Sequence, residues 1–186
     1  GWYWAGRAGI RKLVDRSYPQ HRQRRNHIDD IPALADAEQI RCEPIATDGF
    51  GVKLPEEAVS ALEQTDLAVR FAFGFIRGDS LTAPTYGVLS FHHGDIRTYR
   101  GKPAGFWEFM NNESEIGITL QRITETLDGG EVVVSKSLEI PRNATWQDLE
   151  QLVFTESDDM LVTAINSIAD QTTSPDNIDE LGPVYT

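Results

Sequence analysis

Short apolar segments of strand length alternate with helix-compatible segments along most of this chain. The run Asp66–Phe73 is almost entirely apolar, as expected of a strand that is covered on both faces of a parallel sheet. A second apolar run, Tyr86–His92, follows Pro84, and a valine-rich run, Glu131–Ser135, follows a glycine turn. Strands that alternate with helices predict an α/β domain with a mostly parallel sheet.

Three segments have the composition of helices. A proline followed by two glutamates opens the segment 55–64, and these residues favour the first turn of a helix. Residues 103–111 predict a second, short helix. Apolar residues recur at helical spacings over residues 145–170, which predicts one long helix capped by Asn143 or Thr145.

The length of 186 residues is typical of one domain. We expect a basic N-terminal helix or linker over residues 1–29, the folded domain over 30–170 and a loosely attached tail over 171–186. Residues 1–27 hold seven Lys and Arg side chains and one acidic side chain, although the whole chain has a net charge of -12. The acidic remainder is typical of proteins that stay soluble at high salt, and it argues against nucleic acid as the main partner.

The chain begins at Gly1 with residues that resemble the interior of a protein, so we expect an upstream segment with the first strand or strands to be missing. We see no signal peptide and no apolar stretch of the roughly 18 residues that a membrane helix needs. We therefore expect a cytoplasmic protein without a membrane partner. The single cysteine, Cys42, excludes an internal disulfide and a Cys-based zinc site, and its surroundings, Ile40–Ile45, predict a short strand with a buried thiol.

Polar residues gather where the second apolar strand ends. Ser90 and His92 share one face because side chains alternate along a strand, whereas His93 faces the other way. A hydroxyl and an imidazole on one face can flank a reacting carbonyl, but a histidine that only makes a structural hydrogen bond fits these residues as well. We expect no metal site, since adjacent strand residues diverge and no third ligand has a suitable spacing. A Ser-His-Asp hydrolase is not expected either, because no nucleophile elbow surrounds Ser90.

Six short motifs, in this order, resemble those of the formyltransferase family, which includes methionyl-tRNA, glycinamide ribonucleotide and sugar-amine formyltransferases. The motifs are Phe73-Gly74-Phe75-Ile76-Arg77, Gly87-Val88-Leu89-Ser90-Phe91-His92, Tyr99-Arg100-Gly101, Gly117-Ile118-Thr119-Leu120, Leu127-Asp128-Gly129-Gly130 and Leu181-Gly182-Pro183-Val184-Tyr185-Thr186. The resemblance covers roughly residues 30–186. It implies a Rossmann-like formyltransferase fold.

The resemblance also implies an activity, namely transfer of a formyl group from 10-formyltetrahydrofolate to an amine of a small-molecule acceptor, such as an amino sugar. Ser90, His92 and Asp128 would be the catalytic residues. His92 would support negative charge on the formyl oxygen, and Asp128 would tune the imidazole and relay protons. Two segments would bind the folate, and their residues are Phe75, Ile76, Arg77, Thr124, Glu125, Thr126 and Leu127.

The sequence departs from the family pattern around His92. The family's asparagine, which donates a side-chain N–H to the formyl oxygen, is Ser90 here. His93 and Asp95 stand in a segment that differs from the family's, and with Arg100 they are candidates for accessory residues. Two alternatives stay open, a hydrolase that removes the formyl group from the folate and a non-catalytic binding or regulatory module. The oligomeric state is not defined by the sequence.

Overall fold

The computed structural model describes residues 31–34, 36–71, 73–103, 105–171, 178 and 180–185. The predictions for residues 1–29 lie outside this part of the chain. By its contacts the chain divides into two units, Gly1–Ile40 and Arg41–Thr186. In the first unit the structure describes a short 3-10 helix, η3 (Pro32–Leu34). All elements below belong to the second unit.

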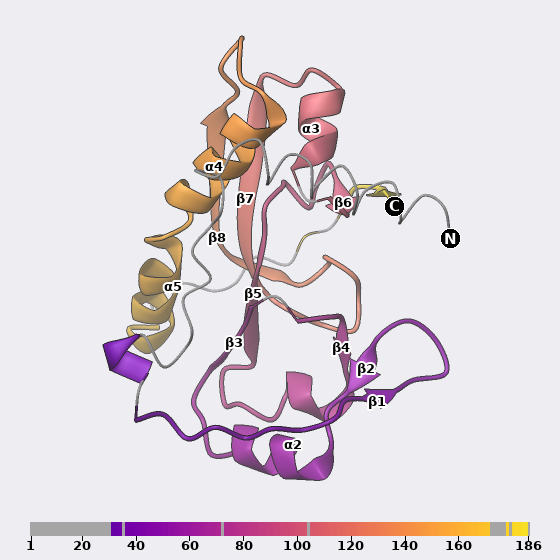
Figure 1. Cartoon of the computed structure of the whole chain (residues 1–186), viewed down its shortest axis with the longest axis vertical. Helices are drawn as coiled ribbons and strands as arrows, with labels where there is room; N and C mark the ends of the chain where they lie inside the picture. Colours follow the sequence, from indigo (N-terminus) through magenta and orange to yellow (C-terminus); the bar gives the residue numbers. More distant parts are fainter. Residues whose placement is uncertain are drawn as a thin grey trace, which may run out of the picture. The chain divides into compact units, whose positions relative to one another are not determined.

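A four-stranded sheet with the order β3-β5-β7-β8 forms the centre of the second unit (Figure 1). Its strands are β3 (Ala68–Arg70), β5 (Val88–His92), β7 (Glu115–Arg122) and β8 (Glu131–Glu139). β3 and β5 run parallel, whereas β5 with β7 and β7 with β8 are antiparallel. The α/β class is confirmed, but the sheet is mixed rather than mostly parallel. The reason is that the short loop 123–130 joins β7 directly to β8 as a hairpin, without the crossover that a parallel pair needs.

Helices cover the apolar face of this sheet. α4 (Trp146–Glu156) and α5 (Met160–Ala169) lie along β7 and β8 (Figure 1). Alternate β7 residues point toward them, as the period of two in a strand requires. The buried apolar core consists of Leu89, Ile116, Ile118, Leu120, Val133, Val153, Met160 and Ala164.

The single long helix expected over residues 145–170 is two helices. Thr145 caps α4 with a reciprocal capping box that includes Asp148. The helix ends at Glu156, and the hydroxyl of its C-cap, Ser157, donates to the carbonyl oxygen of Phe154 at 2.8 Å. Serine and aspartate side chains compete for backbone hydrogen bonds, which explains why Ser157–Asp159 interrupt an otherwise helical pattern.

The remaining elements form two small sheets and short helices. One sheet has the order β1-β2-β4, and the other pairs β6 with β9 in parallel. The bounds are β1 (Ile45–Ala46), β2 (Val52–Lys53), α2 (Glu56–Leu62), β4 (Ile76–Arg77), η4 (Gly78–Leu81), β6 (Arg100–Gly101), α3 (Phe106–Met110) and β9 (Val184–Tyr185). The predicted tail is therefore attached at Val184–Tyr185, where β9 pairs with β6.

Two strand predictions were wrong in extent. The segment Ile40–Ile45 pairs only from Ile45 onward, and the Cys42 thiol is half-buried rather than buried. The apolar run that contains β3 is a strand only over Ala68–Arg70, and Phe71 beyond it is 63% exposed. The apolar run is therefore not buried on both faces. β3 is an edge strand, because among the described strands it pairs only with β5.

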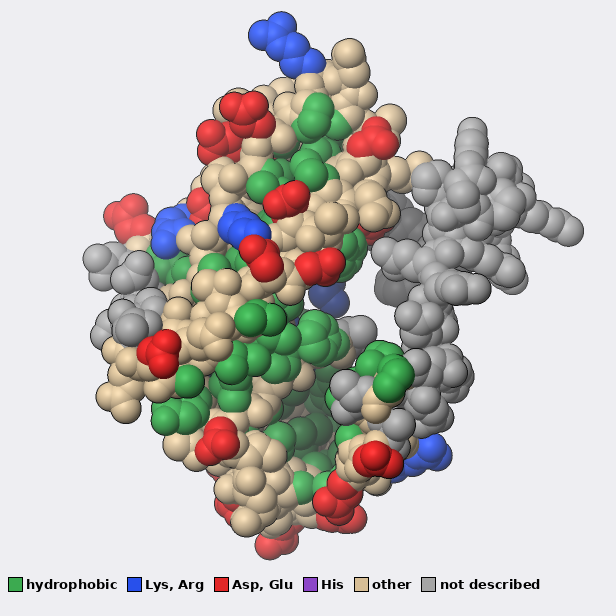
Figure 2. Space-filling model, turned by 90° about the vertical axis from the view of Figure 1, so that its left-hand side faces the viewer, with side chains coloured by type: hydrophobic (Ala, Val, Ile, Leu, Met, Phe, Trp, Pro, Cys, Tyr) green, Lys and Arg blue, Asp and Glu red, His purple; other side chains and the backbone are tan. Residues whose placement is uncertain are grey.

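Apolar side chains also lie exposed between acidic ones on the α4 and α5 side of the molecule (Figure 2). On these two helices they include Phe154, Val162 and Ile165. The helices thus bury only one stripe of their apolar residues. Within the described ranges, no helix combines the length and the apolar character that crossing a bilayer would require.

Candidate functional site

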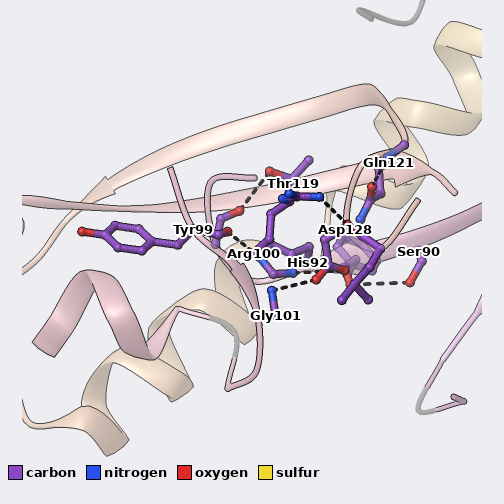
Figure 3. Close-up of polar contacts among 12 residues, drawn as sticks. Ser90, His92, Tyr99, Arg100, Gly101, Thr119, Gln121 and Asp128 are labelled. Atoms are coloured by element: carbon purple, nitrogen blue, oxygen red, sulfur yellow. Dashed lines mark hydrogen bonds and ion pairs between the residues drawn. The ribbon is translucent and has the colours of Figure 1, made fainter. Parts of the chain in front are cut away.

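The face of the sheet opposite α4 and α5 is polar, and it gathers the three residues predicted to be catalytic. Ser90 and His92 come from β5, and Asp128 comes from the turn between β7 and β8 (Figure 3). The His92 Nδ1 atom lies 3.6 Å from Asp128 Oδ1, and its Nε2 atom lies 3.2 Å from the Tyr99 carbonyl oxygen. The ring is therefore held between a carboxylate and a carbonyl, with 5% of its side chain exposed.

Backbone conformation orients the Asp128 carboxylate. Asp128 has a φ of 43°, in the left-handed region that aspartate and asparagine tolerate better than most residues. Its Oδ2 atom accepts a hydrogen bond from the Gly101 backbone N–H at 2.9 Å. One carboxylate oxygen thus faces His92 while the other is fixed to β6.

Burial controls the protonation of His92. Removal from water lowers the pKa of His92, and the nearby carboxylate of Asp128 and the Tyr99 carbonyl oppose that shift. The neutral imidazole can accept a proton, and the adjacent carboxylate would stabilise the resulting cation. This pair can therefore move a proton to or from a ligand.

Arg70 contacts Ser90 in a way that was missed by sequence reasoning. Arg70 and Ser90 are register partners across the parallel strands β3 and β5. The Nε and Nη2 atoms of Arg70 donate to Ser90 Oγ at 3.0 and 2.8 Å. The available signal was a charged residue inside an otherwise apolar strand.

Gln121 is a second polar residue that the sequence did not single out. It lies opposite Ser90 in the register of β5 and β7 and is 1% exposed. Its Oε1 atom accepts a hydrogen bond from Gly130 N at 2.8 Å, which secures the turn that carries Asp128. Within the part of the chain that the structure describes, its Nε2 atom has no hydrogen-bond partner.

The two segments predicted to bind folate lie beside each other. Arg77 Nη1 is 2.8 Å from Glu125 Oε2, and the Gly78 backbone N–H donates to Glu125 Oε1 at 2.7 Å. A cavity of about 430 Å³ opens here, and predicted residues Thr124 and Glu125 line it. Its lining also includes Gly78, Leu81, Thr82 and Tyr86, which sequence reasoning missed.

The other five predicted folate residues do not line that cavity. Ile76 is buried, and the Phe75 ring packs against Phe50 with 5.1 Å between ring centroids. The Arg77 guanidinium lies 5.0 Å from the centre of the Phe75 ring. Thr126 and Leu127 belong to the turn itself, and the Leu127 carbonyl oxygen accepts from Arg100.

The three accessory candidates occupy different places. Arg100 fixes the turn by donating to the Leu127 carbonyl oxygen at 3.0 Å. Asp95 follows β5 on the polar side, and its backbone N–H donates to buried Glu108 at 3.1 Å. His93 lies on the helical side, where its ring centroid is 4.4 Å from that of Phe154. The structure therefore brings Arg100 near Asp128 but separates His93 from it.

His93 is expected to make stability depend on pH. Burial and the neighbouring His92 lower the pKa of His93 from 6.5 to about 4. The unfolded chain therefore binds this proton first as the pH falls below 6.5, so stability is complete above 6.5 and declines toward pH 4. We expect the free energy of unfolding to fall by about 1–3 kcal/mol between pH 7 and 4.5 because of this group. Urea unfolding at both pH values checks this.

A His93→Gln variant provides the comparison for that experiment. It removes the titrating ring of His93 and leaves His92 in place. The loss of unfolding free energy between pH 7 and 4.5 should therefore become smaller by about 1–3 kcal/mol. An unchanged slope in the variant would show that other groups carry the acid sensitivity.

The comparisons with known proteins agree on one family. A family model described as formyl transferase matches residues 23–165. The methionyl-tRNA formyltransferase of Acidobacterium capsulatum is 30% identical over 151 residues, which are 74% of this chain and 49% of the relative. That of Roseiflexus sp. (strain RS-1) is 27% identical over 122 residues, 65% of this chain and 38% of the relative. The chain spans about half or less of the length of these curated relatives.

Two solved structures share the fold at lower identity. A formyltransferase from Anoxybacillus kamchatkensis, in complex with UDP-4,6-dideoxy-4-formamido-L-AltNAc and tetrahydrofolate, has a TM-score of 0.57 and 17% identity, and the match covers 67% of this chain and 66% of that one. Glycinamide ribonucleotide transformylase 1 from Symbiobacterium toebii has a TM-score of 0.56 and 19% identity, and the match covers 67% and 63%. Identities this low show a common fold.

Proposed function

The chain belongs to the formyltransferase family, and from that premise we propose that it transfers a formyl group from 10-formyltetrahydrofolate to an amine of a small-molecule acceptor. The observation that carries the proposal is the His92–Asp128 pair, a buried imidazole 3.6 Å from an oriented carboxylate. Such a pair can take a proton from an attacking amine and return it to a leaving nitrogen.

The cavity beside the Glu125 loop supports a folate donor. Its volume of about 430 Å³ lies within the range of small-molecule sites. Glu125 and the backbone of the turn offer hydrogen-bond acceptors suited to the amino and N–H groups of a pterin. The solved Anoxybacillus relative was obtained in complex with tetrahydrofolate, which agrees with this assignment. The bound folate would supply the formyl carbon.

The chemistry requires one proton to move and one oxygen to carry negative charge. The acceptor nitrogen forms a bond to the formyl carbon, and the carbonyl oxygen becomes negative. Asp128 and His92 take the proton of the attacking amine and deliver it to the folate nitrogen as the old carbon–nitrogen bond breaks. The products are the N-formylated acceptor and tetrahydrofolate. The Tyr99 and Gly101 contacts prevent the two groups from turning away.

We propose an amino sugar as the class of acceptor. The Anoxybacillus relative was solved with a formamido-sugar nucleotide, which supports this class. The curated relatives are methionyl-tRNA formyltransferases, but the net charge of -12 opposes binding of a polyanionic RNA. A UDP-linked amino sugar and glycinamide ribonucleotide are therefore the first acceptors to compare.

Calorimetric titration with tetrahydrofolate tests the donor site. We expect micromolar binding, roughly -8 kcal/mol, and a loss of about tenfold in Glu125→Arg, because that change places two cations where Arg77 now meets a carboxylate. Asp159→Arg is the matched control, since it disrupts a comparable ion pair with Lys136 in a different part of the domain. Folded protein that binds no tetrahydrofolate would contradict the proposed function. Mass spectrometry of the test acceptors then reports formyl transfer.

A further inference from the structure

Arg70 bonds Ser90, the residue that stands where the family pattern has an asparagine. We propose that the Arg70 guanidinium supplies the hydrogen-bond donor for the formyl oxygen and that Ser90 holds this guanidinium in position. The inference rests on the proposed formyl transfer and assigns one further catalytic residue to it.

Because its hydroxyl is already engaged in hydrogen bonds, Ser90 is poorly placed to donate to the formyl oxygen itself. Its Oγ atom has two lone pairs, and two N–H groups of Arg70 occupy them. Ser90 is 2% exposed, and its own hydroxyl points toward the Phe91 carbonyl oxygen at 3.5 Å. A ligand would therefore reach Arg70 before it reached Ser90.

Arg70 has donors to spare. A guanidinium carries five N–H groups. Two of them bond Ser90, and Nη1 donates to the Gly74 carbonyl oxygen at 3.0 Å. The other two make no hydrogen bond to any residue that the structure describes. Because Arg70 is only half-buried, these donors can meet a ligand in the site.

Geometry places Arg70 near the catalytic pair, because it bonds Ser90, which lies two residues before His92 on the same face of β5. Burial lowers the pKa of Arg70, and the Asp128 carboxylate opposes that shift, so the two groups feel each other's field. A cation close to Asp128 also balances the negative charge that develops on the formyl oxygen. Hydrogen bonds from a charged donor are roughly twice as strong as neutral ones, so a guanidinium can replace the amide of asparagine.

The experiment compares the binding of 10-formyl-5,8-dideazafolate with that of 5,8-dideazafolate, which lacks the formyl group. The dissociation constant of 5,8-dideazafolate divided by that of the formyl compound measures recognition of the formyl group without any acceptor. We expect Arg70→Leu to reduce this ratio by about tenfold while binding of the parent compound stays unchanged. Arg142→Leu, the loss of an exposed arginine, is the control for net charge.

Rescue separates a direct contact from a structural contribution. In the Arg70→Leu/Ser90→Asn double variant the amide of the family pattern returns, and the ratio should recover. Arg70→Lys keeps a positive charge but loses the two N–H groups that bond Ser90 together. It should therefore keep only part of the wild-type ratio. If Arg70→Leu does not remain folded by circular dichroism, Arg70→Lys and Ser90→Ala carry the test, each with a reduced ratio expected.

The outcomes distinguish the inference from the function on which it rests. Wild-type protein that binds neither analogue contradicts the proposed function, and the inference fails with it. Variants that bind both analogues with the wild-type ratio overturn the assignment of Arg70 and leave the proposed function intact.

Discussion

Replacing Asp128 by asparagine is expected to lower the rate of formyl transfer by about 10²–10⁴-fold, because the carboxylate that would stabilise protonated His92 and relay the proton is lost. The fold should survive this change. Asparagine tolerates the left-handed backbone at this position, where φ is 43°, and its side-chain oxygen can still accept from Gly101 N. The loss should therefore fall on turnover, with binding of tetrahydrofolate nearly unchanged.

The measurement is the rate of tetrahydrofolate formation with a saturating amine acceptor. Asp158→Asn serves as the matched control, since Asp158 is an exposed aspartate between α4 and α5. A rate for Asp128→Asn within about threefold of wild type would exclude Asp128 from proton transfer, because general acid–base catalysis typically contributes more than that.

A Gly101→Ala change is expected to destabilise the protein by about 2–4 kcal/mol, since two separate costs coincide. Gly101 has a φ of 99°, which side-chain-bearing residues rarely adopt. A Cβ atom there would lie 1.9 Å from the carbonyl oxygen of Tyr185, in the strand that pairs with β6. The pairing of β6 with β9 cannot persist with that contact. Because Gly101 N also anchors Asp128, the change should reduce turnover as well.

Urea unfolding followed by circular dichroism measures this loss. Gly49→Ala is the control, because a Cβ atom at Gly49 meets no other atom within 4 Å and should change stability little. Equal stability of the two variants would show that β6 and β9 contribute little to the native state.

Local sequence patterns predicted which way several side chains point and where one helix begins. Side-chain alternation at the end of β5 places His92 on the face of Ser90 and His93 on the other face, against α4, as the period of two requires. The position of Thr145 as a helix cap also follows from local chemistry. These features depend on neighbours a few residues apart, so the order of residues alone determines them.

Several of the missed features join distant parts of the chain. Arg70 and Ser90 meet because β3 and β5 pair, and Arg77 meets Glu125 because β4 lies beside the loop between β7 and β8. Nothing in the apolar pattern of β3 indicated which residue its arginine would contact. Likewise, the tail that looked loosely attached is held by β6, which lies more than eighty residues earlier in the chain.

The sequence by itself determined the α/β class, the family and the polar strand end with Ser90 and His92, because each of these is written in local periodicity or in short ordered motifs. Only the tertiary structure decided that the sheet is mixed and that the Arg70 guanidinium bonds Ser90. Strand pairing and loop approach depend on closing long stretches of chain against their conformational entropy, and the packing of the whole domain selects which closure occurs.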